Sequence, residues 1–319
     1  MTALTLTLPT VSALITLSGT VKPLMTQKML TFLSALEITE VTEKTIAREI
    51  FLSVKTTTPV AEILTSSNFL NLKEFANLSA LRVDCVAVDP AEFHSVNTRP
   101  FGKKRLLLLD VDSTLIQEEV IELLANKAGA GAEVARITTA AMSGQLEFAA
   151  ALDARVKLLA GLPETVLAEV RKEITLTAGA RELILALQKL GHRVGIVSGG
   201  FIDVIEPLAT ELLINFIRAN KLEIIDGKLT GRLEGTVIDR AGKAQALCDF
   251  AKISGVDIAE TVAIGDGAND IDMLKIAGIG IAFNAKPILQ SVADISLNSP
   301  HLDCALYLMG LSEAEIALI

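Results

Sequence analysis

The sequence predicts an α/β protein built on a Rossmann-like, doubly wound parallel sheet, preceded by a smaller α+β domain. Two observations predict the larger part: short, almost wholly apolar strands recur from residue 105 onward, and helix-patterned segments separate them. Strands this apolar are covered on both faces, as in parallel sheets flanked by helices. A different order of elements before residue 89 predicts the smaller domain, and 319 residues are enough for both.

Residues 1–100 form the predicted N-terminal domain and its linker. Four β-patterned runs alternate with two helical patterns in the order βαββαβ, at residues 13–20, 26–36, 38–43, 48–55, 59–76 and 81–88. This order predicts a ferredoxin-like α+β domain. Residues 89–102 contain two prolines and several polar residues, and they are the predicted linker.

Residues 101–319 form the predicted doubly wound domain. Its expected strands lie at 105–110, 193–197, 261–264, 279–282 and 294–297. Residues 116–190, between the first two strands, are helix-patterned and too many for a simple crossover. We therefore interpret residues 116–175 as a helical cap inserted over the site. A smaller insertion at 222–233 carries Asp226-Gly227 between β-prone flanks, which is typical of a hairpin.

Composition and charge exclude several classes of function. A net charge of −9 and a pI near 5.0 argue against a nucleic-acid surface, because phosphate backbones are bound by clustered Lys and Arg. The apolar runs are far shorter than the roughly 20 residues that cross a bilayer. Residues 1–21 lack a positive leader and contain Pro9, which is unlike a signal peptide. We expect a cytoplasmic protein without a membrane or nucleic-acid partner.

The three cysteines predict no disulfide and no zinc site. Cys85, Cys248 and Cys304 are odd in number and widely scattered, without the paired spacing of a disulfide framework or a zinc centre. We expect buried thiols.

Two aspartates end the first strand of the predicted doubly wound sheet. Asp110 and Asp112 are two residues apart in the run Leu-Asp-Val-Asp-Ser-Thr-Leu, at the edge where an α/β sheet presents its ligand site. Strand alternation directs both carboxylates to one side. The alternative interpretation is a pair of capping or turn aspartates, since Asp-x-Asp-Ser is a good helix start.

A second acidic loop follows the strand at 261–264. It reads Gly265-Asp266-Gly267-Ala268-Asn269-Asp270, and its glycines permit a tight turn around three polar side chains. Asp110, Asp266 and a backbone carbonyl of the first loop form an oxygen-only set suited to Mg²⁺. The alternative is a solvated Gly-Asp turn.

A serine, two glycines and a lysine supply donors for an anion. Ser198-Gly199-Gly200 follows the strand at 193–197 and offers a hydroxyl and free backbone amides. Lys243 lies near the start of a later predicted helix and could reach a phosphate oxygen. The alternatives are a plain helix start and an ordinary surface lysine.

These residues occur in the order of a large family, the haloacid-dehalogenase-type phosphatases, which the chain resembles. The family's Asp-x-Asp-x-Thr signature is present as Asp110, Asp112 and Thr114, and its later motifs as Ser198, Lys243 and residues 265–270. The resemblance implies a Mg²⁺-dependent phosphomonoesterase with Asp110 as nucleophile and Asp112 as general acid and base. It implies that Mg²⁺ is bound by Asp110, Asp266 and the backbone carbonyl of Asp112. Phosphate is expected to contact Ser198, Gly199, Lys243 and Asn269, with Asp270 orienting the lysine and the metal shell.

Within that family, residues 103–300 are most similar to the phosphoserine phosphatases. The cap residues that surround the amino-acid end of the substrate in that group match Glu119, Met142, Phe148 and Arg155 by motif position. A zwitterion away from water requires a cation for its carboxylate and an anion for its ammonium, which Arg155 and Glu119 provide. The resemblance implies hydrolysis of O-phospho-L-serine to L-serine and phosphate in serine biosynthesis.

Other functions stay open from the sequence. One is a phosphotransferase, or a phosphatase acting on another small metabolite such as phosphohomoserine. Another is a signalling module in which a strand-end aspartate is phosphorylated and held, although this leaves the cap and Asp112 without a task. The N-terminal segment resembles ligand-binding ACT-like domains, which often pair, so we expect a homodimer.

Overall fold

The computed structural model describes residues 105–142, 147–298 and 300–308, the four N-terminal strands given below, and residues 33, 35, 36 and 67. The chain divides into two compact units, one of Met1–Gly102 with Gly310–Glu315 and one of Lys103–Met309 with Ile316–Ile319. Among the described residues, no helix combines the length and the apolar character that crossing a membrane requires.

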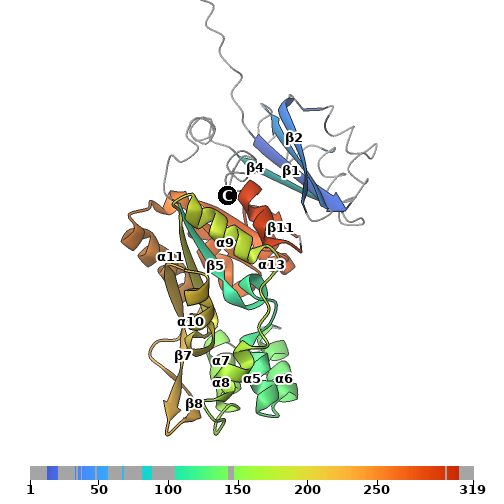
Figure 1. Cartoon of the computed structure of the whole chain (residues 1–319). Coiled ribbons are helices and arrows are strands. Elements are labelled where there is room, and N and C mark those ends of the chain that lie inside the picture. Colours follow the sequence, from blue (N-terminus) through green and yellow to red (C-terminus); the bar gives the residue numbers. More distant parts are fainter. Residues whose placement is uncertain are drawn as a thin grey trace, which may run out of the picture. The chain divides into compact units, whose positions relative to one another are not determined.

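The N-terminal unit contains a four-stranded antiparallel sheet (Figure 1). Its strands are β1 (Ala13–Thr20), β2 (Ile38–Ile46), β3 (Glu49–Thr56) and β4 (Leu81–Ala87). They are ordered β2-β3-β1-β4. The predicted helices at 26–36 and 59–76 fall almost entirely outside the described residues, so the ferredoxin-like, ACT-like domain stays a prediction.

The second unit is built on a seven-stranded sheet. Its order is β11-β10-β9-β5-β6-β7-β8, and every neighbouring pair is parallel except the hairpin β7–β8. This arrangement confirms the predicted doubly wound, mostly parallel sheet. The strands are β5 (Leu106–Asp110), β6 (Arg193–Phe201), β7 (Phe216–Ile225), β8 (Lys228–Glu234), β9 (Thr261–Gly265), β10 (Ile279–Phe283) and β11 (Ile295–Leu297).

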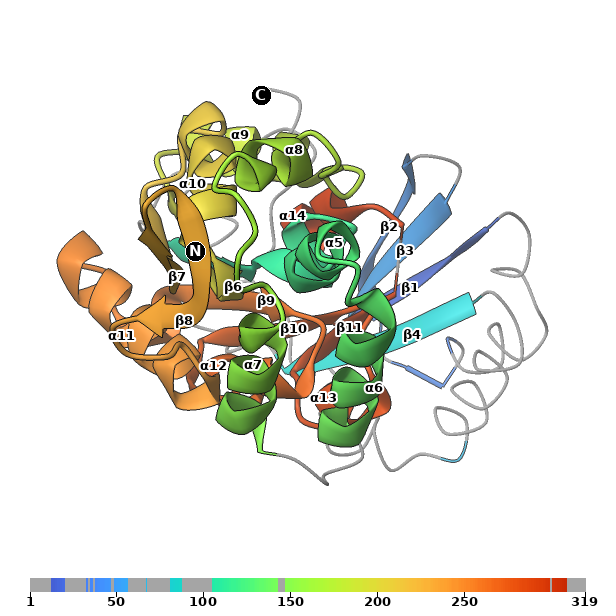
Figure 2. The same cartoon turned by 90° about the horizontal axis from the view of Figure 1, so that it is seen from below.

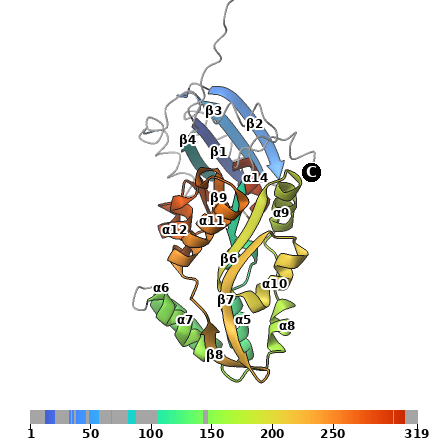
Figure 3. The same ribbon diagram turned by 90° about the vertical axis from the view of Figure 1, so that its left-hand side faces the viewer.

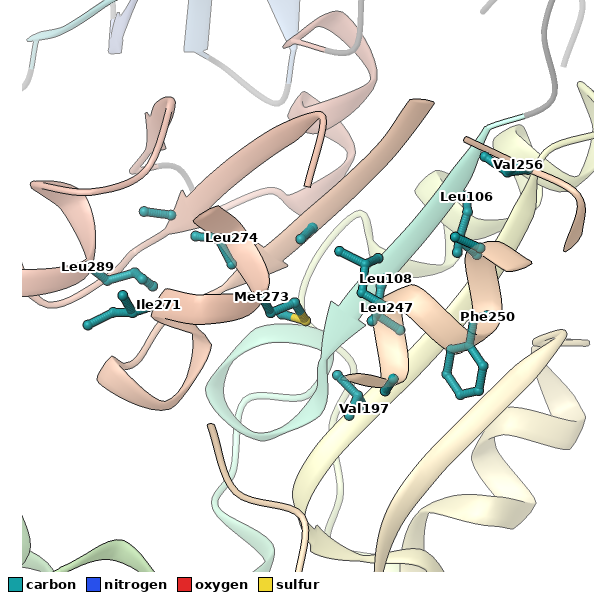
Figure 4. Packing of buried hydrophobic residues seen from close by; sticks show 14 of the residues in the cluster. Leu106, Leu108, Val197, Leu247, Phe250, Val256, Ile271, Met273, Leu274 and Leu289 are labelled. Atoms are coloured by element: carbon teal, nitrogen blue, oxygen red, sulfur yellow. The ribbon is translucent and has the colours of Figure 1, made fainter. Parts of the chain in front are cut away.

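Helices cover both faces of this sheet, which is why its central strands are so apolar. Figure 3 shows α9 (Ala180–Lys189) and α10 (Ile202–Glu211) on one face, and α11 (Arg240–Ser254) and α12 (Ile271–Ile276) on the other. Every residue of β5 is buried. In Figure 4, the side chains of Leu108, Leu247 and Met273 belong to the core between the sheet and α11 and α12.

The insertion between β5 and β6 is helical, as the sequence predicts. It contains α5 (Val120–Lys127), α6 (Gly131–Met142), α7 (Phe148–Lys157) and α8 (Val166–Arg171), seen from below in Figure 2. Its ends meet in a two-stranded stem: Gln117 N donates to Thr175 O at 3.0 Å and Thr177 N donates to Leu115 O at 3.0 Å. The cap therefore leaves and rejoins the sheet at one point.

The predicted hairpin is present, but its first strand starts earlier than the sequence suggested. The turn is Asp226-Gly227, with φ of 50° and 71°, and Ile225 pairs with Lys228. β7 begins at Phe216 rather than at 222, because its first half pairs in parallel with β6. Short elements complete the unit: the turns Val111–Leu115, Ile258–Glu260, Ala268–Asp270 and Leu302–Cys304, and the helices α13 (Pro287–Gln290) and α14 (Ala305–Leu308).

The hairpin also hydrogen-bonds to the cap. Gly161 N donates to Leu229 O at 2.8 Å, Leu229 N donates to Leu162 O at 2.9 Å, and Glu164 N donates to Gly227 O at 2.8 Å. The cap segment between α7 and α8 thus lies along the hairpin, with an isolated antiparallel bridge between Pro163 and Lys228. The cap is therefore attached to the rest of the unit through this hairpin as well as through its stem.

Candidate active site

The sheet reverses its direction of growth at β5, and the predicted site lies there. After β5 the chain builds β6 and β7 on one side, and later β9, β10 and β11 on the other. Asp110 is in register with Val197 of β6, and Leu109 is in register with Ile264 of β9. The three motif loops therefore leave the sheet side by side at its carboxyl edge, which is where such folds bind ligands.

A buried ion-pair group forms the centre of the site. Lys243 Nζ lies 2.7 Å from Asp110 Oδ1 and 2.8 Å from Asp270 Oδ1, and the exposed fractions of Lys243 and Asp270 are both 0%. Lys243 stands in the first turn of α11, which Asp239 caps by accepting a hydrogen bond from Gly242 N at 2.8 Å. The structure therefore excludes the interpretation of Lys243 as an ordinary surface lysine.

The carboxylates outnumber the cations around this lysine. Oxygen atoms of Asp110, Asp266 and Asp270 all lie within 4.8 Å of one another. Burial, followed by the charges of Asp270 and Asp266, raises the pKa of Asp110 well above its ordinary value. Burial and Asp270 likewise raise the pKa of Asp266 to about 6. Burial opposes the charge of Lys243, but Asp110 and Asp270 outweigh it and raise the pKa of the ammonium.

This excess of negative charge fits a divalent cation. Three carboxylates and one ammonium leave the described group anionic, and all the acidic donors are hard oxygen atoms, as Mg²⁺ prefers. The sequence predicts that Asp270 orients Lys243 and the metal-binding residues without binding the metal itself. In the structure, Asp270 belongs to the carboxylate cluster itself and also pairs with Lys243.

Glycines in the second acidic loop allow its chain to pass close to Asp270. A Cβ atom on Gly265 would lie 2.4 Å from Asp270 Cγ, far inside contact distance. Gly267 N donates to Asp270 Oδ2 at 3.1 Å, so the loop closes on this carboxylate. Asn269 lies between them in the turn Ala268–Asp270 and is partly buried.

Asp112 links the cap to residues 198–200 at the end of β6, which we call the donor loop of β6. Its Oδ2 accepts a hydrogen bond from Ser198 Oγ at 2.7 Å, and its Oδ1 accepts one from Val120 N, the first residue of α5, at 2.8 Å. Gly200 N donates to Ser198 Oγ at 2.6 Å. A Cβ atom on Gly200 would come within 2.8 Å of Asp112 Oδ2, so a glycine is needed for this approach.

Glu119, the predicted ammonium ligand, stands at the entrance to the cap just before α5. Ser113 Oγ donates to Glu119 Oε1 at 2.7 Å, from a backbone with the uncommon φ of 56°. Burial, followed by repulsion from Asp112, raises the pKa of Glu119 to about 7. A carboxylate in this state gains stability from a cation beside it.

Arg155 reaches the same region from α7. Burial lowers the pKa of its guanidinium, and the charges of Glu119 and Asp112 oppose this shift. Arg155 Nε donates to Ala151 O at 3.2 Å, and Nη1 donates to Thr138 Oγ1 at 3.4 Å. Met142 ends α6 and Phe148 begins α7, while their side chains lie outside what the structure describes.

Two polar residues near the site were not singled out by the sequence. Ser113 lies inside the first motif, where only its contact with Glu119 reveals it. Asn220 is only 2% exposed in β7, next to the donor loop of β6. A lone amide in a run that also contains Phe216, Ile217 and Ala219 is the signal that could have identified it.

The fold and the site define a member of a known hydrolase family. The model of the haloacid dehalogenase-like hydrolases matches residues 107–275, just over half of the chain. The chain therefore belongs to the haloacid dehalogenase-like hydrolase family. This membership confirms the family resemblance that the sequence motifs indicated.

Known relatives within that family are phosphoserine phosphatases. Phosphoserine phosphatase SerB2 of Mycobacterium tuberculosis is 58% identical over 67% of this chain and 52% of its own length. The enzyme of Streptococcus thermophilus is 48% identical over 62% of this chain and 93% of its own. A solved structure titled as a phospho-aspartyl intermediate analogue of phosphoserine phosphatase is 45% identical, with a TM-score of 0.62, over 65% of this chain and 99% of the other.

The chain covers a different fraction of the length of each of these relatives. The chain spans about half the length of the first two curated relatives it matches, at 52% and 56%. It spans nearly all of the shorter enzyme of Streptococcus thermophilus. The comparisons confirm the narrower resemblance to the phosphoserine phosphatases.

Proposed function

We propose that this protein is a phosphoserine phosphatase, which hydrolyses O-phospho-L-serine to L-serine and phosphate through an aspartyl phosphate. The observation that carries the proposal is the buried Asp110 at the sheet edge, paired with Lys243 at 2.7 Å beside the donor loop of β6. The relatives support this substrate over phosphohomoserine or transfer to another alcohol, since their names specify phosphoserine.

In the first step, a carboxylate oxygen of Asp110 attacks phosphorus and the bond to the serine oxygen breaks. Asp112 gives a proton to that departing oxygen, so serine leaves as an alcohol. Ser198 Oγ and Val120 N hold the Asp112 carboxyl from two sides, at 2.7 and 2.8 Å. Asp110 accepts a hydrogen bond from Val111 N at 2.7 Å, which fixes its orientation.

In the second step, water attacks the phosphorus of the acyl phosphate. Asp112, now ionised, takes a proton from this water, and the bond between phosphorus and Asp110 breaks. Phosphate leaves and both carboxyl groups return to their starting states. Asp112 thus serves first as acid and then as base, so it gives one proton and regains one proton in each cycle.

Negative charge on the transferring group must be balanced, since two anions meet in each step. Lys243, Ser198 and the amides of the donor loop supply part of this balance, with Gly199 and Asn269 as further phosphate contacts. Mg²⁺ bound by Asp110, Asp266 and the backbone carbonyl of Asp112 would supply the rest as a Lewis acid. Asp270 holds Lys243 in place.

The cap selects the substrate in this proposal. Glu119 receives the ammonium and Arg155 the carboxylate of phosphoserine, with Met142 and Phe148 as an apolar wall. The raised pKa of Glu119, about 7, supports the first role, because a neighbouring cation removes the penalty on its ionised form. A closed cap also keeps bulk water from the acyl phosphate.

Phosphate release from a panel of phosphorylated metabolites tests the proposal. The panel contains O-phospho-L-serine, O-phospho-L-threonine, O-phosphohomoserine and p-nitrophenyl phosphate, each with Mg²⁺ and with EDTA. We expect the highest kcat/KM for phosphoserine, and loss of activity in EDTA that added Mg²⁺ restores. Better turnover of another metabolite would overturn the substrate, and full activity in EDTA would overturn the metal.

Trapping experiments separate hydrolysis from the other two functions. Added alcohols should not divert phosphate from water, whereas a phosphotransferase would form new monoesters. Acid-quenched enzyme should contain a short-lived aspartyl phosphate; a phosphate held for minutes on Asp110 would indicate a signalling module. The cytoplasmic location and the homodimer stay predictions, which fractionation and sedimentation measure.

A further inference from the structure

We infer that Asn220 is a positioning residue that holds residues 198–200 and the Lys243 helix in place around the transferred phosphate. The inference rests on the proposed function, because it concerns the same phosphate site. It starts from an interruption in the pairing of β6 with β7, which lie side by side in Figure 3. Val197 pairs with Arg218, but the next pair is Phe201 with Asn220.

The interruption leaves backbone groups of residues 198–200 without ladder partners from β7. Buried backbone carbonyls require a hydrogen-bond donor from some other source. Asn220 supplies it, since its Nδ2 donates to Gly199 O at 2.8 Å. The side chain of a strand residue thus replaces a missing backbone hydrogen bond between the strands, at the donor loop of β6.

This contact fixes the direction of the amide that orients Ser198. The carbonyl of Gly199 and the N–H of Gly200 belong to one planar trans peptide, so they point in opposite directions. Asn220 donates to the carbonyl on one side, and the N–H donates to Ser198 Oγ at 2.6 Å on the other. Without Asn220 the peptide could rotate and release Ser198, which is a phosphate contact in the proposed function.

The other end of the same carboxamide reaches the lysine helix. Asn220 Oδ1 accepts a hydrogen bond from Ile238 N at 2.7 Å. Ile238 precedes Asp239, which caps α11 and accepts at its carbonyl from Lys243 N at 2.9 Å. One side chain, 2% exposed, therefore ties the donor loop of β6 to the segment that carries the phosphate-facing ammonium.

Two variants test the inference on the full chain. Asn220→Ala removes both hydrogen bonds, while Asn220→Asp keeps the acceptor for Ile238 N and places a carboxylate oxygen against Gly199 O. We expect kcat for phosphoserine to fall about 100-fold in both, as for a misplaced donor. KM should change less than about threefold, since the cap residues that bind the amino-acid end are untouched.

Asn215→Ala is the matched control. Asn215 Oδ1 also accepts from a backbone amide, Val194 N at 2.9 Å, but at the opposite end of β6. We expect its kcat and KM within about twofold of wild type. Rates are normalised to the active-site fraction from a single-turnover burst, so that a loss of folded protein is not counted as a loss of rate.

Orthovanadate with Mg²⁺ gives a readout that a merely structural role would not move. It should raise the melting temperature of wild type and of Asn215→Ala, and the Asn220 variants should need about 100-fold more vanadate for the same rise. Wild-type kcat and vanadate response in either folded Asn220 variant would overturn the inference. A failure of vanadate to stabilise the wild type would also overturn the inference, because the donor loop of β6 would then bind no phosphoryl group.

The same experiments distinguish this inference from the proposed function. A wild type that cleaves p-nitrophenyl phosphate but not phosphoserine would refute the substrate, and the Asn220 variants would then be measured on the aryl ester. If Asn220→Ala fails to fold, the isosteric Asn220→Asp decides, and vanadate binding by that variant needs no turnover.

Discussion

The sheet edge and the cap position their charged residues in different ways. At the sheet edge, Asp110, Lys243 and Asp270 are at most 2% exposed, and both carboxylates pair with Lys243. In the cap region, Glu119 and Arg155 are partly exposed, and their described hydrogen bonds go to the first motif and to the cap helices. The sheet therefore fixes the groups that we propose to react, while the groups that we propose to select the substrate bond to separate partners.

The largest expected effect in this comparison follows from replacing Asp110, the proposed nucleophile. Asp110→Asn should lower kcat for phosphoserine by about 10⁴-fold or more, because an amide oxygen is a poor nucleophile and the acyl phosphate no longer forms. KM should change little, since the cap residues remain. Phosphate release measures the first quantity and saturation kinetics the second.

Asp257→Asn is the control for Asp110→Asn. Asp257 accepts from Ala259 N at 2.9 Å in an exposed turn just before β9, at the opposite end of that strand from the acidic loop, and its loss should leave kcat within about twofold. Turnover by Asp110→Asn at the wild-type rate would refute the nucleophile, and with it the central role given to the sheet edge.

A cap variant should show the opposite pattern of kinetic change. Arg155→Ala removes the proposed partner of the substrate carboxylate, so KM for phosphoserine should rise about 30- to 100-fold. The KM for p-nitrophenyl phosphate, which lacks this carboxylate, should stay within about threefold. Arg136→Ala, which removes an exposed partner of Glu133 on α6, should change neither. Equal losses on both esters would contradict carboxylate binding by Arg155.

The pH dependence sharpens the role of the cap carboxylate. The pKa of Glu119 is raised to about 7, so the group is neutral below that pH and ionised above it. The kcat/KM for phosphoserine should therefore fall as the pH drops through about 7, approaching tenfold per unit. Glu119→Gln should have a lower kcat/KM and lack this inflection. An inflection that persists in Glu119→Gln would assign it to another group or to the substrate phosphate.

The smallest expected effect concerns the stability of the sheet edge in the absence of ligands. The folded-state pKa of Asp266, about 6, exceeds the ordinary value of 3.8 for an aspartate. Ionised Asp266 therefore destabilises the metal-free protein fully above pH 6, and this penalty disappears as the pH falls below about 4. Asp266→Asn should raise the free energy of unfolding by about 1–3 kcal/mol at pH 8 in EDTA.

Chemical denaturation at pH 8 and pH 4 measures this gain. It should be present at the higher pH and largely absent at the lower one. Asp226→Asn, in the exposed hairpin turn, is a control that should change neither value by more than about 0.5 kcal/mol. A loss of stability in Asp266→Asn at pH 8 would show that the carboxylate cluster is not held under charge repulsion.

Sequence patterns predicted the sheet edge well because its residues follow strands with simple rules. The strand of Leu106–Asp110 is a short apolar run, and parallel strands bring their carboxyl ends together whatever the intervening loops contain. The sequence alone thus placed Asp110, Asp266 and Lys243 in one region. The early start of β7 at Phe216 was missed, because half of this strand pairs with β6 and half with β8.

Long-range side-chain contacts were beyond sequence reasoning for a physical reason. The link from Asn220 to Gly199 depends on an interruption in strand pairing, which leaves no period in the sequence. Similarly, the roles of Met142 and Phe148 came only from family resemblance. Helices of an insertion are placed by packing, and packing has no local code comparable to strand alternation.

The attachment of the cap through its stem and through the hairpin has a consequence for engineering. Residues 117 and 175 are hydrogen-bonded neighbours in the stem, which makes the insertion look like a cassette that could be exchanged for that of another phosphatase. The bonds from Gly161 and Leu162 to Leu229 mean that the hairpin belongs to the same cassette. A chimaera that transplants the cap helices alone would leave unpaired backbone groups on the cap and on the hairpin. Exchanging the cap and the hairpin together would preserve the hydrogen bonds between them.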